Sequence, residues 1–386
     1  MDVAKLEAWL KARGEPKFRA DQVRQAVFKD HVFSYDEIET LPAALRKALS
    51  RERPILSVIL DQIEVSRDGR ARKAVLKLGD GRSIETVLLK PSAARLTACI
   101  SSQVGCAIRC SFCATGLMGF ARSLSAEEIS DQVLFWRQYI RREWGAGLDI
   151  GHHEDEEDER PMSRPDPLAL TNVVYMGMGE PFNAYDAVAE SLRRLTDQRQ
   201  FAMAARRVSV STSGVAPKIA RFGRDFPQIN LALSLHAAED ELRAKLVPLN
   251  KAYPLKILAQ ALRDYLKETN RKIFLEYVML KGRNDAPHNA RDLVRFAKSC
   301  GPLPLLHVNL IAYNEAAPGH AATPDPEIRR FQQSLLKEGL AVTVRQNLGR
   351  DIHGACGQLL VPEPPGAPNV AAPAGRGAGA GSEGVR

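Results

Sequence analysis

Residues 96–113 read LTACISSQVGCAIRCSFC and decide the fold class, because a short β-rich run leads directly into a cluster of cysteines. From this point on, β-rich runs alternate with longer helical patterns. The strand candidates lie at 96–101, 171–178, 207–212, 229–235, 273–280 and 305–311. Helical patterns follow them at 125–142, 184–196, 215–222, 238–270 (with a break at Pro248 and Pro254), 286–299 and 324–339.

Six β/α units in sequence predict an α/β protein with an incomplete (β/α)6 barrel. A doubly wound parallel sheet is the alternative, and periodicity does not separate the two. In both folds we expect the chemistry at the carboxyl ends of the strands.

The segments outside this alternation divide the chain further. Residues 1–50 have helical spacing and predict a small helical domain, while 51–92 predict a connector with hairpins at the Asp-Gly pairs 68–69 and 80–81. The core then spans 93–347, and a terminal loop spans 348–361. Within the core, 144–168 contains six consecutive acids and predicts a solvated insertion. Residues 362–386 are rich in Pro, Gly and Ala and predict a disordered tail.

Composition excludes several protein classes. The chain has 386 residues, of which 45% are hydrophobic, so disorder throughout is excluded. It contains no apolar run long enough to cross a membrane and no secretory h-region near its start, so we expect a cytoplasmic protein. Lys and Arg exceed Asp and Glu by 8, and residues 201–300 alone carry 18 basic against 9 acidic side chains. This excess is compatible with an anionic partner.

The three clustered cysteines, Cys106, Cys110 and Cys113, have the spacing C-x3-C-x2-C. Structural zinc sites and most 4Fe-4S clusters take four protein ligands. Three thiolates would leave one iron of a 4Fe-4S cluster open to a small molecule. Such an iron could bind S-adenosylmethionine and deliver an electron to its sulfonium, with Phe112 shielding the cluster. The alternatives are a zinc knuckle in a non-enzymatic RNA-binding protein, or three structural thiols.

Longer stretches around this run resemble the radical S-adenosylmethionine methyltransferases of the RlmN type, which modify adenine C2 in RNA; the C8-acting Cfr branch is close. The matching stretches cover residues 1 to about 360 and are GEPKFRADQV (14–23), IETVLL (84–89), CISSQVGCAIRCSFCATGLMGFARSLSAEEI (99–129), NVVYMGMGEP (172–181), VSVSTSGVAPKI (208–219), LALSLHA (231–237), HVNLIAYN (307–314) and DIHGACGQL (351–359). The resemblance implies an incomplete barrel behind an N-terminal helical domain that binds RNA.

The resemblance also implies an activity. The substrates would be an adenosine of 23S rRNA in the peptidyl-transferase region and the tRNA adenosine beside the anticodon, both methylated at C2. C8 methylation of the same rRNA nucleotide is the alternative. One 4Fe-4S cluster, two S-adenosylmethionine molecules per turnover, and a flavodoxin-type or other electron donor would be needed. We expect a monomer with no membrane association.

Residue roles follow from the same resemblance. Cys356 would take a methyl from one S-adenosylmethionine, and a radical made from the second would abstract hydrogen from that methyl. The resulting carbon radical would add to adenine C2. Glu85 would accept the C2 proton, and Cys99 would release the product through a transient disulfide with Cys356. Cys300 matches no motif and is expected to be structural.

The expected contacts to S-adenosylmethionine all lie at or just beyond the ends of strand candidates; they are Gly179, Glu180, Ser211, Ser234, Leu235, His236 and Asn314. Without the resemblance, two of these site residues would be interpreted as structural or surface residues. Glu85 alone would be a solvent-facing carboxylate on a strand. His236 alone would equally be a satisfied core histidine.

Overall fold

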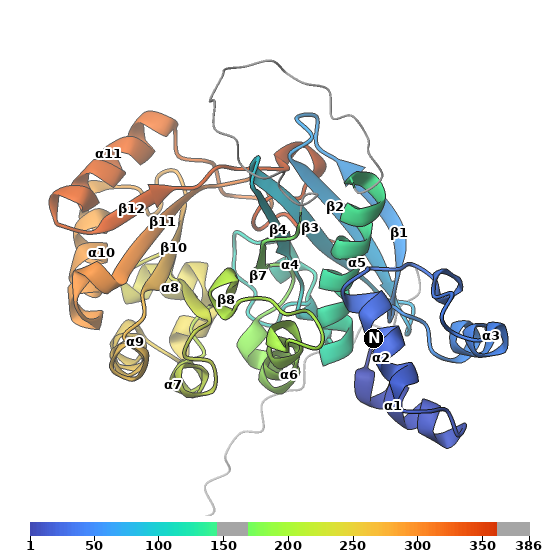
Figure 1. Cartoon of the computed structure of the whole chain (residues 1–386). Helices are drawn as coiled ribbons and strands as arrows, with labels where there is room; N and C mark the ends of the chain where they lie inside the picture. Colours follow the sequence, from blue (N-terminus) through green and yellow to red (C-terminus); the bar gives the residue numbers. More distant parts are fainter. Residues whose placement is uncertain (145–168, 361–386) are drawn as a thin grey trace, which may run out of the picture.

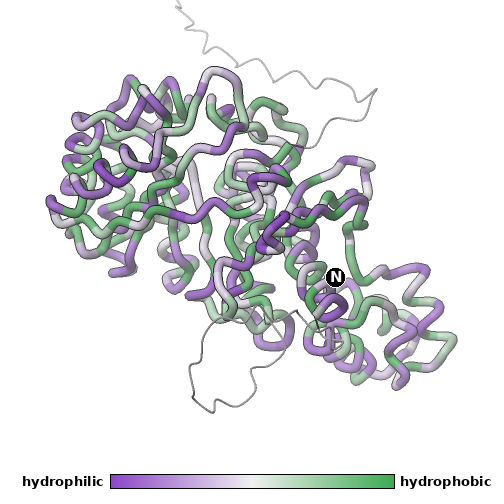
Figure 2. Tube along the Cα trace, turned by 90° about the horizontal axis from the view of Figure 1, so that it is seen from above, coloured by the Kyte–Doolittle hydropathy of each residue, from purple (hydrophilic) through white to green (hydrophobic). Residues whose placement is uncertain are grey.

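The computed structural model describes residues 1–144 and 169–360 (Figure 1). Nearly all of the insertion expected at 144–168, and the tail expected at 362–386, lie outside these described residues. The described chain is built around one ten-stranded sheet with the order β1-β2-β3-β4-β7-β8-β9-β10-β11-β12. In Figure 2, hydrophobic and hydrophilic positions are interspersed along much of the chain.

Parallel strands form the larger part of the sheet; they are β4 (Arg95–Cys99), β7 (Asn172–Tyr175), β8 (Val208–Thr212), β9 (Asn230–Ser234), β10 (Ile273–Met279), β11 (Leu306–Ala312) and β12 (Ala341–Val344). All six predicted strands are confirmed. The short, half-exposed edge strand β12 was missed, because AVTV lies inside a polar stretch. The strand order follows the chain with no reversal, so the fold is an incomplete barrel and not a doubly wound sheet.

Helices connect these strands on the outer side of the curved sheet (Figure 1); they are α5 (Ala126–Trp144), α6 (Tyr185–Thr196), α7 (Ala216–Asp225), α8 (Asp240–Leu246), α9 (Leu255–Thr269), α10 (Pro287–Cys300) and α11 (Asp325–Lys337). The expected break is confirmed. Helix α8 ends before Pro248, which begins the short 3-10 helix Pro248–Lys251, and α9 begins directly after Pro254. Proline lacks the backbone N–H that would continue the hydrogen-bond ladder.

Three antiparallel strands extend the sheet beyond β4: β1 (Val58–Val65), β2 (Ala71–Leu78) and β3 (Ser83–Ser92). Their turns contain the two predicted Asp-Gly pairs, and Gly69 and Gly81 have φ values of 66° and 80°, which a residue with a Cβ adopts at a cost. Val87 of β3 pairs with Cys99 of β4, so this extension brings Glu85 close to the first parallel strand.

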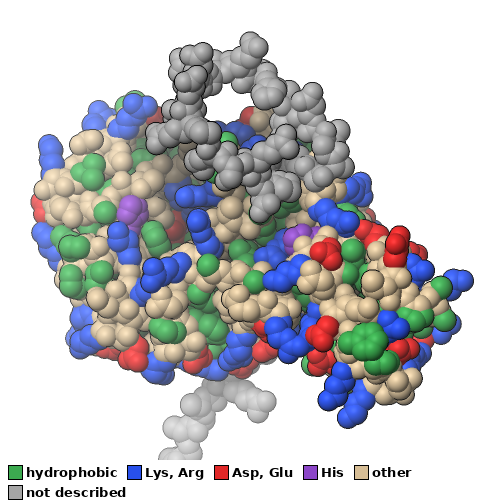
Figure 3. Space-filling view, in the orientation of Figure 1, with side chains coloured by type: hydrophobic (Ala, Val, Ile, Leu, Met, Phe, Trp, Pro, Cys, Tyr) green, Lys and Arg blue, Asp and Glu red, His purple; other side chains and the backbone are tan. Residues whose placement is uncertain are grey.

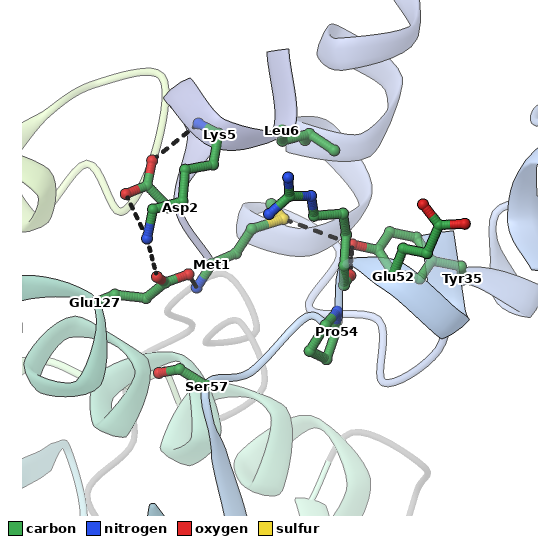
Figure 4. A pocket seen from close by; sticks show the side chains of 10 residues that line it. Met1, Asp2, Lys5, Leu6, Tyr35, Glu52, Pro54, Ser57 and Glu127 are labelled. Carbon is green, nitrogen blue, oxygen red and sulfur yellow. Dashed lines mark hydrogen bonds and ion pairs between the residues drawn. The ribbon is translucent and has the colours of Figure 1, made fainter. Parts of the chain in front are cut away.

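The N-terminal helices α1 (Val3–Ala12), α2 (Phe18–Phe28) and α3 (Ala43–Glu52), with the 3-10 helix Tyr35–Glu37, form a lobe beside α5 (Figure 1). The Gln138 side chain of α5 donates a 2.6 Å hydrogen bond to the Val32 carbonyl, which ties the two parts together. A cavity of about 190 Å³ lies at this junction and is lined in part by Lys5, Tyr35 and Glu127 (Figure 4). None of its lining residues belongs to the expected catalytic set.

The remaining short elements are β5 (Gln103–Gly105), β6 (Phe120–Ser123), α4 (Ala114–Leu117) and the 3-10 helices Pro181–Ala184, Ala205–Arg207, Leu303–Leu305 and Arg350–Ile352. Strands β5 and β6 pair with each other at the carboxyl end of β4. No helix in the described part of the chain is long and apolar enough to cross a membrane.

Candidate active site

The cysteine motif occupies the loop between β5 and α4. Its start is fixed by a 2.7 Å hydrogen bond from the Cys106 N–H to the Gly119 carbonyl, and its end is the residue that precedes α4. Gly105 has a φ of 75°, and a Cβ there would lie 2.0 Å from the Gly119 oxygen. Glycine is therefore required at this position to let the loop approach β6.

The three motif thiols lie against apolar side chains, including Ile108, Phe112 and Tyr313. Burial raises the pKa of Cys106 to about 12, and burial together with the neighbouring Cys113 and Cys106 raises the pKa of Cys110 well above its ordinary value. Because burial disfavours the charged form, these cysteines become thiolates only when a positively charged group is bound to them.

The donor set is compatible with an iron-sulfur cluster. Within residues 1–144 and 169–360, no three His, Cys, Asp or Glu side chains converge as the ligands of one metal ion. The cysteines of a cluster bind irons at separate corners and so lie farther apart than the ligands of a single ion. Three thiols on one loop, packed against apolar side chains, are donors of the kind that such a cluster takes.

The C-terminal loop is bonded directly to the cysteine motif. The Ala114 N–H donates to the Gly357 carbonyl (2.8 Å), and the Thr115 hydroxyl donates to the Leu359 carbonyl (2.7 Å). Asn314, just beyond β11, donates from Nδ2 to the Cys356 carbonyl at 3.2 Å. The exposed Cys356 is thereby held beside the motif.

Cys99 lies at the end of β4 and near Cys356, so the charge of Arg345 acts on both thiols. Burial, together with a negative charge on Cys356, raises the pKa of Cys99 to about 12. Desolvation by the surrounding protein atoms also raises the pKa of the Cys356 thiol, although the residue keeps part of its surface exposed to solvent. All six cysteines are free thiols, so the disulfide expected between Cys99 and Cys356 is not formed in this structure.

Glu85 is 3% exposed, so the interpretation of this residue alone as solvent-facing is wrong. Its Oε1 lies 3.1 Å from Lys73 Nζ, and its Oε2 accepts a 2.7 Å hydrogen bond from the Leu360 N–H. The C-terminal segment covers β3, which a pattern of local residues does not reveal. Burial raises the pKa of Glu85, and the Lys73 ammonium opposes this increase.

Glu180 follows β7 and is buried at the carboxyl end of the sheet. Its carboxylate accepts hydrogen bonds from the backbone N–H groups of Phe182 (3.0 Å) and Ser213 (2.6 Å). Gly179 has a φ of 101°, and a Cβ there would lie 2.5 Å from the Cβ of Gln103. Packing against Gln103 is thus sufficient to require glycine, independently of any ligand.

Ser211 is the next-to-last residue of β8 and Ser234 is the last residue of the neighbouring strand β9. Their hydroxyl oxygens are 3.1 Å apart. Leu235 is fully buried, and its backbone N–H donates to the Glu276 carbonyl at 3.0 Å. Its side chain is therefore part of the core, which leaves only its backbone to face a ligand.

His236 is a buried residue with a φ of 59°. Its Nδ1 accepts a 3.1 Å hydrogen bond from the Val278 N–H, and its ring packs edge-to-face on Phe112 with centroids 4.8 Å apart. Burial lowers the pKa of His236 to about 3, so the ring is neutral at pH 7. The ring thus has a hydrogen-bond partner in the core, and it also packs against the cysteine loop through Phe112.

Asn314 has a buried side-chain oxygen, Oδ1, with no hydrogen-bond partner among the described residues. An unpaired buried acceptor is costly, on the order of 1–3 kcal/mol. A ligand with an N–H or O–H donor would relieve this cost. This is the observation in the expected S-adenosylmethionine set that points most directly to a bound molecule.

Comparisons with known proteins identify the family. The dual-specificity RNA methyltransferase RlmN of Halorhodospira halophila is 40% identical over 93% of this chain and 92% of its own. The probable dual-specificity RNA methyltransferase RlmN 2 of Opitutus terrae is 40% identical over 93% of this chain and 86% of its own. The chain belongs to the RlmN family. Residues 1–55 also match the family model described as the ribosomal RNA large subunit methyltransferase N-terminal domain.

A solved structure is also similar to this chain in its fold. A radical SAM methyltransferase from Sphaerobacter thermophilus is 40% identical, with a TM-score of 0.82 over 93% of this chain and 97% of that one. The incomplete barrel and the N-terminal helices of this RlmN-family chain are thus features of a radical SAM methyltransferase.

Sequence reasoning missed two charged residues beside the thiols of this RlmN-family site. Arg345, after β12, donates from Nη1 to Glu276 Oε2 at 3.2 Å and contacts the Met176 sulfur at 3.7 Å. The Arg345 charge lowers the pKa of both Cys99 and Cys356. For Glu276 the sequence did contain a signal, namely a glutamate inside the apolar strand IFLEYVML. For Arg345 it contained none.

Proposed function

We propose that this chain methylates C2 of an adenosine in 23S rRNA and in tRNA beside the anticodon, through a methyl group carried on Cys356. The observation that carries the proposal is that the cysteine motif lies next to a second set of thiols, Cys99 and Cys356. The hydrogen bond from Ala114 to Gly357 joins the cysteine motif to the loop of Cys356, and Cys99 lies close to that loop. The similar relatives are named RlmN, which favours C2 over the C8 alternative.

This arrangement suits the chemistry of the substrate. Adenine C2 lies between two ring nitrogens and is too electron-poor to attack the methyl of a sulfonium. When bound by Cys106, Cys110 and Cys113, a 4Fe-4S cluster supplies the electron that opens a radical route. Residues at the ends of the strands would bind S-adenosylmethionine. Among them, Asn314 Oδ1 would accept a hydrogen bond from the ligand. The other contacts would come from Gly179, Glu180, Ser211, Ser234, Leu235 and His236.

Cys356 would take the methyl from the first of two S-adenosylmethionine molecules used per turnover. A bond forms between the Cys356 sulfur and the methyl carbon, and the carbon–sulfonium bond breaks with its electron pair going to the leaving thioether. The thiolate is the nucleophile, and the nearby Arg345 guanidinium favours that form. The same methyl group, after losing a hydrogen atom, would bond to C2.

Release would then use Glu85 and Cys99. The C2 proton leaves to the Glu85 carboxylate. The Cys99 thiolate bonds to the sulfur of Cys356 while the bond from Cys356 to the transferred carbon breaks, and that carbon takes up a proton to become the methyl group. The unpaired electron left by the radical addition would pass to the iron-sulfur cluster that Cys106, Cys110 and Cys113 would hold. The resulting disulfide needs two electrons from a flavodoxin-type or other donor before the next turnover.

RNA binding would involve the N-terminal domain (1–50) and the basic part of the core. Lys and Arg side chains are spread over the face shown in Figure 3, including the middle of the molecule. Phosphate contacts of this kind position RNA without reading its sequence. We propose a monomer acting in the cytoplasm, where both RNAs are found.

The regiochemistry is tested by digesting methylated 23S rRNA and tRNA to nucleosides and locating the methyl by mass spectrometry against synthetic standards. Methyl at C2 is expected, and methyl at C8 would overturn this choice. Anaerobic reconstitution with iron and sulfide tests the zinc-knuckle alternative. A protein that takes up zinc and develops no visible iron-sulfur absorption would contradict the proposal.

Cys99→Ala protein is expected to accumulate RNA covalently attached at Cys356, because no second thiol is available to release it. Denaturing gel electrophoresis with labelled RNA measures the adduct. Cys300→Ala is the matched control, since Cys300 is buried at the end of α10 and has no role in the proposed reaction. Normal turnover without an adduct in the Cys99 variant would exclude its role.

A further inference from the structure

Lys73 is a charged residue of β2 that is 7% exposed, and no sequence motif pointed to it. Its Nζ lies 3.1 Å from Glu85 Oε1 and 3.5 Å from Glu64 Oε1. Register pairs Lys73 with Val87 and Val75 with Glu85, so Lys73 and Glu85 are diagonal neighbours on one face of the sheet. A buried ammonium is costly unless it is paired, so its position indicates a specific partner.

The two oxygens of Glu85 have different partners. Oε1 is held by Lys73, within the sheet. Oε2 is held by the N–H of Leu360, on the terminal segment that also carries Cys356. That segment must move when Cys356 meets different partners in turn, whereas β2 is fixed by pairing on both sides.

We propose that Lys73 is a positioning residue that keeps Glu85 ionised and anchored through Oε1, so that Oε2 takes the C2 proton once the Leu360 N–H has left it. The inference rests on the proposed function and deepens it. In this step the C2–H bond breaks, the proton binds to Oε2, and the bonding pair stays in the adenine ring. The loop that delivers the methyl carbon thus also uncovers the base.

The charges facing Glu85 fix the sign of the expected effect. Lys73 from β2 lowers the pKa of Glu85, and Glu64 from β1 raises it. The third neighbour, the Leu360 N–H, also lowers it. Since only the ionised carboxylate accepts a proton, removing Lys73 raises the pKa of Glu85 and removes activity from the acidic side of the pH range.

The test uses the full-length holoenzyme already methylated on Cys356 and measures the rate of single-turnover RNA methylation against pH. For Lys73→Met we expect the acid limb to move to higher pH by about one unit or more. Lys73→Arg should restore much of the wild-type profile. Lys77→Met is the matched control on the same strand, because Lys77 is exposed and paired with Asp61, and its profile should not change.

Glu64→Gln supplies an independent variant at a more exposed position, and it should move the acid limb to lower pH. If Lys73→Met does not fold, this variant carries the test alone. A uniform loss in Lys73→Met with an unmoved limb, or an unmoved limb in Glu64→Gln, would overturn the inference. Wild-type enzyme that never methylates RNA would instead contradict the proposed function, so the two failures are distinguishable.

Discussion

Cys356→Ala protein is expected to form no methylated RNA, a loss on the order of 10⁴-fold or more, as for other enzymes that lose a covalent nucleophile. The fold should survive, because Cys356 is exposed and the loop is held by main-chain groups. These are the Cys356 carbonyl bonded to Asn314 and the Gly357 carbonyl bonded to Ala114. The measurement is transfer of a radiolabelled methyl to RNA.

The same preparation should retain the iron content and visible absorption of the wild type, because Cys356 is outside the C-x3-C-x2-C motif. Cys300→Ala serves as the matched control for loss of a thiol and should keep full activity. RNA methylation at an undiminished rate by the Cys356 variant would overturn the route through an S-methylated cysteine.

Cys110→Ala is expected to lose both the iron-sulfur absorption and the reductive cleavage of S-adenosylmethionine, and with them all RNA methylation. Cys110 is the middle thiol of the motif, and burial together with the charges of Cys113 and Cys106 raises its pKa. Two remaining thiols do not hold a cluster that normally needs three or four. Iron analysis and 5′-deoxyadenosine production are the measurements.

Ser111→Ala is the matched control for this loop. Ser111 is the next residue, and its hydroxyl is buried without a hydrogen-bond partner among the described residues, so its removal should leave the cluster intact. Equal iron loss in both variants would show that the loop is merely fragile. A Cys110 variant with wild-type iron content and activity would exclude this thiol as a ligand.

Local patterns were sufficient for most of the fold. Six of the seven parallel strands and the helices between them were predicted because each is a contiguous run with its own periodicity, bounded by Gly, Pro or polar residues. The two hairpins followed from Asp-Gly turns. The order of the strands was not encoded in any one run, which is why the doubly wound alternative stayed open until the sheet was seen.

The electrostatics of the site were not predictable in the same way. Lys73 contacts Glu85 from another strand, and Arg345 reaches Glu276 from beyond β12. Glu85 looked exposed because its cover, the segment that ends at Leu360, is far away in the sequence. Long-range packing of this kind changes burial and pKa values without leaving a local signal.

The central claim is that the methyl group reaches RNA by way of Cys356 and loses one hydrogen there. Its most direct test is one round of RNA methylation with S-adenosylmethionine carrying a fully deuterated methyl group, followed by mass spectrometry of the methylated nucleoside. The account predicts a C2 methyl that retains two of the three deuteriums, with the third in 5′-deoxyadenosine. A methyl that retains all three deuteriums would contradict it, because direct polar transfer breaks no bond to hydrogen.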